Sequence, residues 1–431
     1  MLKAMTLLKP GNFRALFFAI TIGTTSEMVF GLTGLITVSK QTGSALSIGL
    51  MVVLTTLPTV CLAPFQGVVV DRFDKTRLAV WSNLIRAAVV LLTVATVWFD
   101  LFSVTVLYVC IFCYYILWYF LIPTTESLLK EVLPKGESVT GMAIVQGAYQ
   151  AGVLIAAPVA GLMVDGFGLA NTFLVAASMD VASAIFFRRV KLPRAETKAA
   201  ALPSSEASNR LSTYVGHYLA EIKAGWRYTL SNRLLLLLVI VAASAHPFFQ
   251  AINTLLAPFV YGSLKGEAFS CGLIEGGAGL GSLLSAILCL SFMRLGSTGI
   301  VLLMSQLLLM LSLLGFSMMA SMPGALLAYV AVGLFVGNLK VLSKSIVLEM
   351  VHREFSGRVM SAVSLLGLTV GIFTALGAGL IADRSIFYAY VFTSAFILLP
   401  CAATICWLMA ARWSKSSTMI RSELLGEESA L

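Results

Sequence analysis

The sequence predicts an all-α membrane protein with twelve transmembrane helices, arranged as two pseudo-symmetric halves of six. Three observations predict this class: the composition, the number of long apolar segments and an internal repeat. Of the 431 residues, 59% are hydrophobic and 11% are charged, and the mean hydropathy is +0.94. Soluble domains contain about 25% charged residues. Most side chains of this chain must therefore face lipid or a large buried interior.

Twelve apolar segments are long enough to cross a bilayer, whose hydrocarbon core of about 30 Å needs roughly 20 helical residues. Turn-forming residues such as Lys9-Pro10-Gly11 and Pro134-Lys135-Gly136 separate several of them. We expect helices over about 13–38, 47–70, 78–98, 103–124, 140–164, 170–187, 234–259, 270–293, 298–320, 324–347, 358–381 and 387–411.

The two halves of the chain repeat in parallel. Residues 42–50 align with residues 265–273. A second alignment, in a slightly different register, matches Glu131, Met142, Gly161 and Asp165 with Glu349, Met360, Gly379 and Asp383. Both alignments keep their place in the helix order, which predicts six helices followed by six equivalent ones. Halves of this kind are typical of membrane transporters whose repeats are related by an axis along the membrane normal.

The basic residues predict the orientation of the chain. The net charge is +9, but the basic residues lie between apolar segments rather than on one surface, so we expect no nucleic-acid partner. With both termini inside, only Lys40, Lys265 and Arg384 fall in outer loops. This asymmetry follows the positive-inside rule. We expect a multi-pass protein of the bacterial inner membrane with both termini in the cytoplasm.

The segment between the halves is polar. We divide the chain into an N-terminal bundle (1–188), a cytoplasmic linker (189–232), a C-terminal bundle (233–411) and a cytoplasmic tail (412–431). Residues 202–206 predict a flexible linker. Apolar residues recur at helical spacing from Leu211 to Leu230, which predicts an amphipathic helix on the inner membrane surface.

The turn between the second and third helices carries the most specific motif. It reads Gly-Val-Val-Val-Asp-Arg-Phe-Asp-Lys-Thr-Arg over residues 67–77 and resembles the Gly-x-x-x-Asp-Arg-x-Gly-Arg-Arg loop of the major facilitator superfamily. Asp74 stands where that motif has its second glycine. The resemblance implies a role in conformational gating for Gly67, Asp71, Arg72, Lys75 and Arg77.

Within that superfamily, the chain is most similar to macrolide-efflux-type proteins. The similar segments are 42–45, 70–75, 221–225, 357–359 and 382–384. The resemblance implies export of macrolides, other drugs or siderophores.

Ionisable residues inside the predicted helices are candidates for transport, because a charge in the bilayer costs several kcal/mol unless it faces a cavity or a partner. They are Glu27, Arg86, Asp180, His246, Glu275, Lys340 and Lys344.

Glu27 is the strongest of these candidates. It lies near the middle of the first helix, beside the polar Thr24-Thr25-Ser26 and between Gly23 and Gly31. A carboxyl group there can hold a proton when it is desolvated and release it when the cavity opens to the cytoplasm. The alternative is a structural pair with another buried group.

The other charged candidates have open roles. Arg86 either neutralises a buried acid or holds the Asp71 turn, and we favour a structural role within the gating apparatus. Asp180, in the sixth helix, serves coupling or structure. Lys340 and Lys344 share one face of the tenth helix near its inner end. They either extend to the cytoplasm or present positive charge to an anionic substrate; we favour the first for Lys344 and leave Lys340 open.

His246 precedes Pro247 in the seventh helix, where a proline kink is expected to open a polar pocket with Gln250 and Asn253. Histidine titrates near neutrality, so these residues are candidates for coupling or substrate binding. A hydrogen-bonded structural histidine is the favoured alternative.

The fifth helix contains Gly147, Gly152, Pro158 and Gly161, a spacing of small residues and one proline that permits close helix contacts and a bend. This pattern resembles the glycine/proline motif of antiporters in the superfamily. Residues 113–120 of the fourth helix contain no arginine where proton antiporters often have one, which excludes coupling through that position.

The sequence therefore predicts a secondary transporter that exports a small organic molecule, drug- or macrolide-like, by alternating access against protons. The alternatives are export of an anionic siderophore, movement of a lysolipid, or a transport-inactive sensor or scaffold. The chain has no Walker, HExxH or GxSxG motif, so we expect no enzyme activity, cofactor or metal. We expect a monomer whose partners are the bilayer, the substrate and protons.

Overall fold

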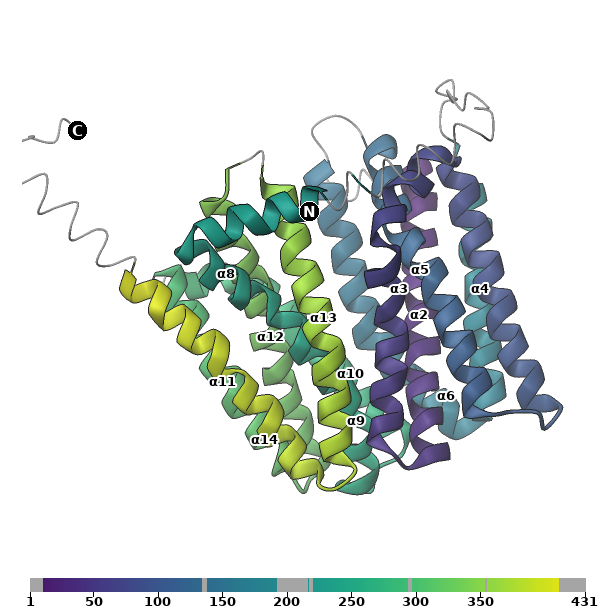
Figure 1. Cartoon of the computed structure of the whole chain (residues 1–431). Coiled ribbons are helices and arrows are strands. Elements are labelled where there is room, and N and C mark those ends of the chain that lie inside the picture. The colour runs from purple at the N-terminus through teal and green to yellow at the C-terminus, as the bar shows by residue number, and fades with distance from the viewer. Residues whose placement is uncertain are drawn as a thin grey trace, which may run out of the picture.

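The computed structural model describes residues 11–133, 138–191, 216, 220–293, 297–352 and 355–410, and these residues form helices and no strand (Figure 1). The helices of the first half are α2 (Asn12–Thr42), α3 (Ala45–Arg72), α4 (Lys75–Trp98), α5 (Val104–Val132) and α6 (Ser138–Arg188). Those of the second half are α8 (Arg233–Ala243), α9 (Ala245–Gly262), α10 (Ala268–Met293), α11 (Thr298–Ser317), α12 (Met322–Met350), α13 (Ser356–Ala382) and α14 (Ile386–Phe396), and helix continues over 398–410.

Helix α6 contains two membrane spans. Its 51 residues would extend about 77 Å as one straight helix, more than twice the hydrocarbon thickness of a bilayer. Gly168 divides it, with φ of 79° and ψ of 173°, in a region that residues with a side chain rarely adopt. The predicted fifth and sixth helices are therefore joined at one glycine rather than by a separate loop.

Helices α8 and α9 together form the seventh span. The break lies at Ser244, three residues before Pro247. Proline has no N–H to donate to the carbonyl one turn earlier, here that of Ala243, so the helix is interrupted just ahead of it. The interruption lies at Ser244, which keeps right-handed helical dihedral angles (φ −64°, ψ −22°), and the kink at Pro247 stays a prediction.

Eleven segments of the described chain are long and apolar enough to cross a membrane, and the one over Ile144–Arg188 holds two spans. The structure thereby confirms the predicted class, an all-helical fold of twelve spans.

The bundle has two ends, which we name by their turns. The hairpin face carries the α3–α4 turn (71–77), and the opposite face carries the α2–α3 turn (42–45) and the α13–α14 turn (382–386). In Figure 1 the hairpin face is at the top and the opposite face at the bottom.

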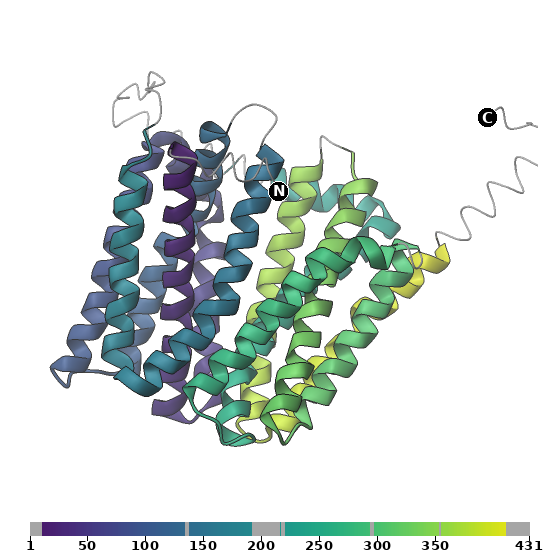
Figure 2. The same ribbon diagram turned by 180° about the vertical axis from the view of Figure 1, so that it is seen from behind.

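The two halves meet mainly through α6 against α10 and α3 against α13. Small residues line these contacts: a Cβ on Gly272 would lie 2.1 Å from the Ala157 carbonyl oxygen, and one on Gly49 would lie 2.8 Å from that of Ala375. All four residues lie in the parts of their helices nearer the opposite face, where the ribbons of the two halves converge (Figures 1 and 2). The halves are therefore closed against each other at the opposite face.

Part of the linker is described as a helix over residues 220–231. It lies against the start of α13, where Tyr228 stacks on Phe355 at 4.5 Å between ring centroids and Glu221 lies 3.9 Å from Arg358. A Cβ on Gly225 would lie 2.6 Å from the Arg358 carbonyl oxygen. Residues 202–206, residues 211–215 and 217–219 of the expected amphipathic helix, and the tail after residue 410 lie outside the described residues.

Candidate functional site

A cavity of about 260 Å³ lies inside the first half, among α2, α5 and α6. Its lining comes from the parts of these helices nearer the hairpin face, so it lies on the side where the two halves are not closed by the glycine contacts. The lining residues are Ala19, Ile20, Gly23, Thr24, Trp118, Leu121, Ile122, Thr125, Glu126, Leu129, Val145, Gln146, Tyr149 and Phe187.

The cavity combines an apolar surface with a few polar groups. Trp118 and Tyr149 provide aromatic walls, Thr125 and Gln146 provide hydrogen-bonding groups, and Glu126 is the one charged side chain among these described lining residues. Apolar walls with a small number of placed polar groups are typical of sites for small organic ligands. A carboxylate beside aromatic rings favours a ligand with a positively charged group.

Glu27 lies one helical turn deeper than Thr24 of the cavity wall, on the same side of α2. Its side chain is 8% exposed, and the Tyr115 hydroxyl donates a hydrogen bond to its Oε1 at 2.7 Å. Gly31 makes room for Tyr115, because a Cβ there would lie 3.0 Å from the hydroxyl. The carboxyl group thus has one hydrogen-bond donor and lies one helical turn beyond the cavity wall.

Arg86 and Asp180 form an ion pair within the first half. Arg86 Nη2 lies 2.9 Å from Asp180 Oδ1, and neither side chain is exposed. Arg86 also donates to Asn83 Oδ1 (3.1 Å), to the Gly23 carbonyl (3.4 Å) and to the Tyr114 hydroxyl. The structure therefore gives Asp180 a charge partner from the third span.

The Arg86 guanidinium also connects this pair to the cavity. It lies 4.8 Å from the centroid of the Trp118 ring, which is part of the cavity wall. Arg86 lies within electrostatic range of Glu27 as well. Of the two acids that sequence reasoning singled out in this half, Asp180 therefore pairs with Arg86, whereas Glu27 is bound by Tyr115.

The second half carries a group of basic side chains on α9 and α12. Lys340 Nζ lies 4.7 Å from the centroid of the Phe249 ring, and His246 is within electrostatic range of both Lys340 and Lys344. The His246 ring contacts α13 at Gly367, where a Cβ would lie 3.0 Å from its Cδ2. The structure thus brings these three predicted residues together, on the other half from Glu27.

In the pocket expected beside Pro247, one of the polar side chains is already engaged in a hydrogen bond to the other half. Gln250 donates its side-chain amide to Thr56 of α3, which makes it a contact between the halves. Asn253 is half-buried and makes no side-chain hydrogen bond among the described residues.

The glycine/proline residues of the fifth span lie at two different contacts. Gly152 faces α2, with its Cβ position 3.5 Å from Thr25 Oγ1. Pro158 and Gly161 face α10: Pro158 Cγ is 3.0 Å from the Cβ position of Gly276, and a Cβ on Gly161 would lie 2.3 Å from the Ala268 carbonyl oxygen. Substitution of Gly161 would therefore force the halves apart.

The predicted gating residues lie at the end of α3 and the start of α4. Gly67, Asp71 and Arg72 are in the last two turns of α3, and their side chains lie outside the described part of the structure. Asp74 caps α4 by accepting the Arg77 N–H at 2.8 Å, and Lys75 pairs with Glu131 at the end of α5. Asp74, which stands where the motif has its second glycine, is therefore the N-cap of α4, a position that favours aspartate.

Sequence reasoning missed several residues of the cavity, notably Glu126, Gln146 and Tyr149. Glu126 was missed because the fourth helix was expected to end at residue 124, whereas α5 continues to Val132. A usable signal was present: Trp118, Ile122, Thr125 and Leu129 recur at helical spacing and share the cavity-facing side of α5.

Comparisons to known proteins support the fold. The Major Facilitator Superfamily model matches residues 16–375, and the chain belongs to this superfamily of membrane transporters. A curated relative, the uncharacterized MFS-type transporter YkuC of Bacillus subtilis (strain 168), is 27% identical over 241 residues, which cover 54% of this chain and 53% of that protein. The chain thus spans about half the length of the curated relative it matches.

Solved structures share the fold at low identity. A crystal structure of the nucleoside transporter NupG is 13% identical with a TM-score of 0.70, over 92% of this chain and 98% of that one. A bacterial homologue of the human lysosomal transporter Spinster, inward-facing and unoccupied, is 13% identical with a TM-score of 0.68, over 94% and 98%. The peptide transporter POT in complex with sulfate is 14% identical with a TM-score of 0.69, over 93% and 94%.

Proposed function

We propose that this protein exports a small drug- or macrolide-like organic molecule across the bacterial inner membrane by alternating access, in exchange for protons. The observation that carries the proposal is the cavity of the first half, with the Glu126 carboxylate and two aromatic rings in its wall and Glu27 one turn deeper. We place the hairpin face in the cytoplasm, as the positive-inside rule predicts. The cavity then receives its substrate from the cytoplasmic side.

The proposed cycle uses the two acids differently. Glu126 attracts a ligand that carries a positive charge, and Trp118 and Tyr149 contact its apolar part. Glu27 exchanges a proton as the halves rearrange, because a ligand drives a conformational equilibrium only through a difference in affinity between the two states. The buried Arg86–Asp180 pair keeps the helices around both acids in place. Of the predicted coupling candidates, Glu27 therefore takes the coupling role and Asp180 a structural one.

The test compares substrate binding in two variants of the cavity. Glu126→Gln retains the size of the side chain but removes its charge, so we expect affinity for a lipophilic organic cation to fall by roughly tenfold or more. Affinity for a neutral molecule of similar shape should stay the same. Gln146→Glu, on the facing wall, is the matched variant and should raise cation affinity. Equal cation affinity in all three proteins would rule out this site.

A second candidate is transport of an anionic molecule such as a siderophore or a lysolipid. The observation that favours it is the group of Lys340, Lys344 and His246, which has no acidic partner among the described side chains. Lys340→Gln should then weaken binding of organic anions, while Glu126→Gln should not. Absence of flux for either ligand class from reconstituted vesicles would instead favour a sensor or scaffold. The similar fold of the nucleoside and peptide transporters does not favour one substrate class over another for this chain, because their sequence identity to it is low.

A further inference from the structure

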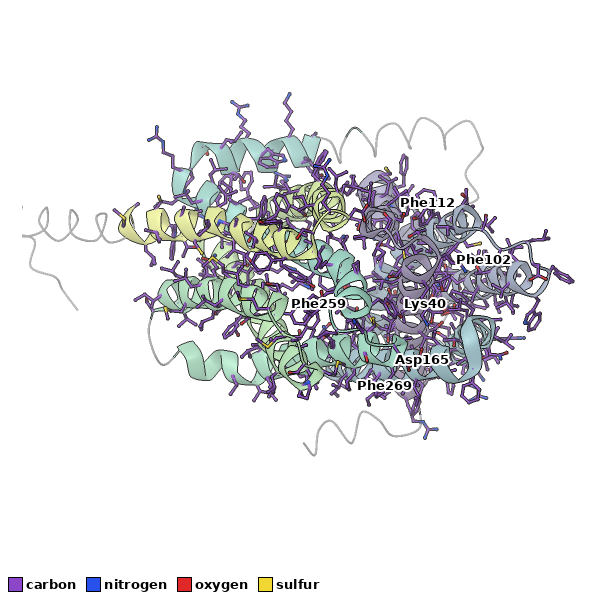
Figure 3. All side chains as sticks on the ribbon, turned by 90° about the horizontal axis from the view of Figure 1, so that it is seen from below. Lys40, Phe102, Phe112, Asp165, Phe259 and Phe269 are labelled. Carbon is purple, nitrogen blue, oxygen red and sulfur yellow. The ribbon has the colours of Figure 1, made fainter. Side chains whose placement is uncertain are left out.

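Asp165 of the first half binds the start of a helix in the second half. Its carboxylate accepts hydrogen bonds from the backbone N–H groups of Ala268 (3.2 Å, to Oδ1) and Phe269 (2.7 Å, to Oδ2), the first two residues of α10. Lys40 Nζ lies 3.7 Å from Oδ1 of the same carboxylate. Figure 3 looks onto the opposite face and shows Lys40, Asp165 and Phe269 together where the halves meet.

Asp383 of the second half makes the reciprocal contact. Its Oδ1 accepts the backbone N–H groups of Ala45 (2.6 Å) and Leu46 (3.4 Å), the first two residues of α3. The Ser44 hydroxyl donates to Oδ2 at 2.9 Å. Both contacts therefore join a carboxylate of one half to the two leading amides of a helix in the other.

The two contacts are related by the internal repeat. The two acceptors correspond in one alignment of the halves, and the two donor pairs correspond in the other. Each aspartate also follows a glycine by one helical turn, Gly161 before Asp165 and Gly379 before Asp383. A Cβ on these glycines would lie 2.3 Å and 2.8 Å from the carbonyl oxygen of the first residue of α10 and α3, respectively. The glycine admits the partner helix, and the aspartate then reaches its amides.

We propose that Asp165 and Asp383 are a matched pair of latches that hold the opposite face closed and must both release when that face opens. The proposal rests on the alternating access of the proposed function but not on the substrate, the coupling ion or the direction of transport. The physical basis is the interaction of a negative charge with the positive end of a helix and its unsatisfied N–H groups.

Such latches suit a gate that must reopen. When the halves separate at this face, water can solvate both the carboxylates and the amides, so release leaves no buried unpaired group. Helix-end interactions of this kind are individually modest. Two of them bias the closed state without locking it.

The two latches differ in their third contact. Lys40 belongs to the same half as Asp165, so it stays beside that carboxylate when the latch opens. Ser44 belongs to the half opposite Asp383, so its hydroxyl separates from the carboxylate together with the amides. On opening, the Asp383 carboxylate therefore loses three hydrogen bonds and the Asp165 carboxylate loses two, while Lys40 also leaves the Tyr261 ring of the second half, 5.7 Å from its centroid. We expect the larger effect of neutralising a carboxylate at Asp383.

The test measures the gate directly with pairs of spin labels in a background whose seven cysteines are replaced by alanine. One pair, at Gln41 and Ser263, spans the two halves at the opposite face; a second, at Lys130 and Lys223, spans them at the hairpin face. All four positions are exposed. Asp165→Asn and Asp383→Asn are compared singly and together, because asparagine retains the size of the side chain and removes its charge.

The matched control is Asp100→Asn. Asp100 lies in the α4–α5 turn of the same face and has φ of 55°, a conformation that asparagine tolerates. Its side chain forms no ion pair among the described residues. The Asp100→Asn substitution removes one negative charge from the same face and changes neither Asp165 nor Asp383.

We expect the ratio of open to closed opposite-face distances to rise roughly two- to fivefold for each aspartate replaced. The larger single effect should be that of Asp383→Asn, and the two effects should multiply in the double variant. The distance between the labels at the hairpin face should shorten to a corresponding extent. Distance distributions that superimpose on those of the Asp100→Asn protein would overturn the proposal. The single variants each keep one latch, so they give the answer if the double variant does not fold. Loss of transport without any distance change would count against the latches, whereas a distance change in a protein that exports no drug would count only against the proposed function.

Discussion

The Arg86 guanidinium lies 2.9 Å from the Asp180 carboxylate, and both side chains are fully buried within the first half. Two helices besides their own contact the arginine: α2 provides the Gly23 carbonyl, and α5 provides the Tyr114 hydroxyl and the Trp118 ring. The pair is neutral as a whole. Its members therefore stabilise the bundle only while both are present.

The first prediction concerns this pair. Arg86→Met should lower the free energy of unfolding by roughly 3–5 kcal/mol, because it leaves the Asp180 charge buried without a partner. Thermal unfolding of the purified protein in detergent measures the loss. The double variant Arg86→Met/Asp180→Leu should recover most of it. A double variant no more stable than Arg86→Met would mean that the ion pair is not the main role of the arginine.

The second prediction concerns Glu27. Glu27→Gln keeps an oxygen that can accept a hydrogen bond from the Tyr115 hydroxyl, but the glutamine side chain cannot exchange a proton. The variant should therefore abolish accumulation of substrate driven by a pH gradient. Exchange of substrate across reconstituted vesicles without a gradient should persist. Tyr115→Phe is the matched control, because it removes the hydrogen bond and keeps the carboxyl group; it should retain gradient-driven transport at a reduced rate. If Glu27→Gln still concentrates substrate, coupling belongs to another carboxyl group.

The third prediction concerns the turn between α3 and α4. Asp71→Asn should slow transport and shift the protein toward the state that is open at the hairpin face, because we expect Asp71 to bind the neighbouring basic turn and a helix end of the other half when that face closes. Distances between labels at Lys130 and Lys223 report the shift.

Asp74→Asn is the control for this turn. It removes a charge three residues away and keeps an effective N-cap for α4, since asparagine caps helices as well as aspartate does. Normal turnover in Asp71→Asn, or an equal defect in Asp74→Asn, would mean that the motif determines only the orientation of the chain and has no role in gating.

The fourth prediction concerns orientation. A cysteine introduced at Ser103 or Gly324 should react with a membrane-impermeant thiol reagent added to intact cells, because both positions lie at the opposite face. A cysteine at Ser205 should react only after the membrane is permeabilised. Labelling of Ser205 from outside would reverse the proposed orientation.

The sequence was sufficient for the number of spans and for their repeat, because both depend on segment length and order along the chain. The correspondence of Asp165 with Asp383 was also predictable from the alignment of the halves. Their contacts with α10 and α3 were not, because they depend on how closely two helices from different halves approach each other. The alignment shows equivalence between residues but no distance between them.

The candidate site was predictable only in part. Glu27 was found because a lone carboxylate within an apolar span is conspicuous. The pairing of Arg86 with Asp180 joins the third and sixth spans, and no local pattern encodes such a contact. Glu126 was missed because the fourth helix was expected to end at about residue 124, whereas α5 continues for six residues beyond Glu126.

The single-glycine corner at Gly168 has a mechanical consequence. Asp165 lies three residues before the corner, and Asp180 lies twelve residues after it, within the same helical element. With no loop to absorb displacement, a rotation of the fifth span at the gate must be taken up at one pair of dihedral angles or passed on to the sixth span. The sixth span carries Asp180, which pairs with Arg86, and the Arg86 guanidinium lies against the Trp118 ring in the cavity wall. Lengthening this corner by two or three glycines should therefore decouple occupancy of the cavity from movement of the gate while leaving each intact.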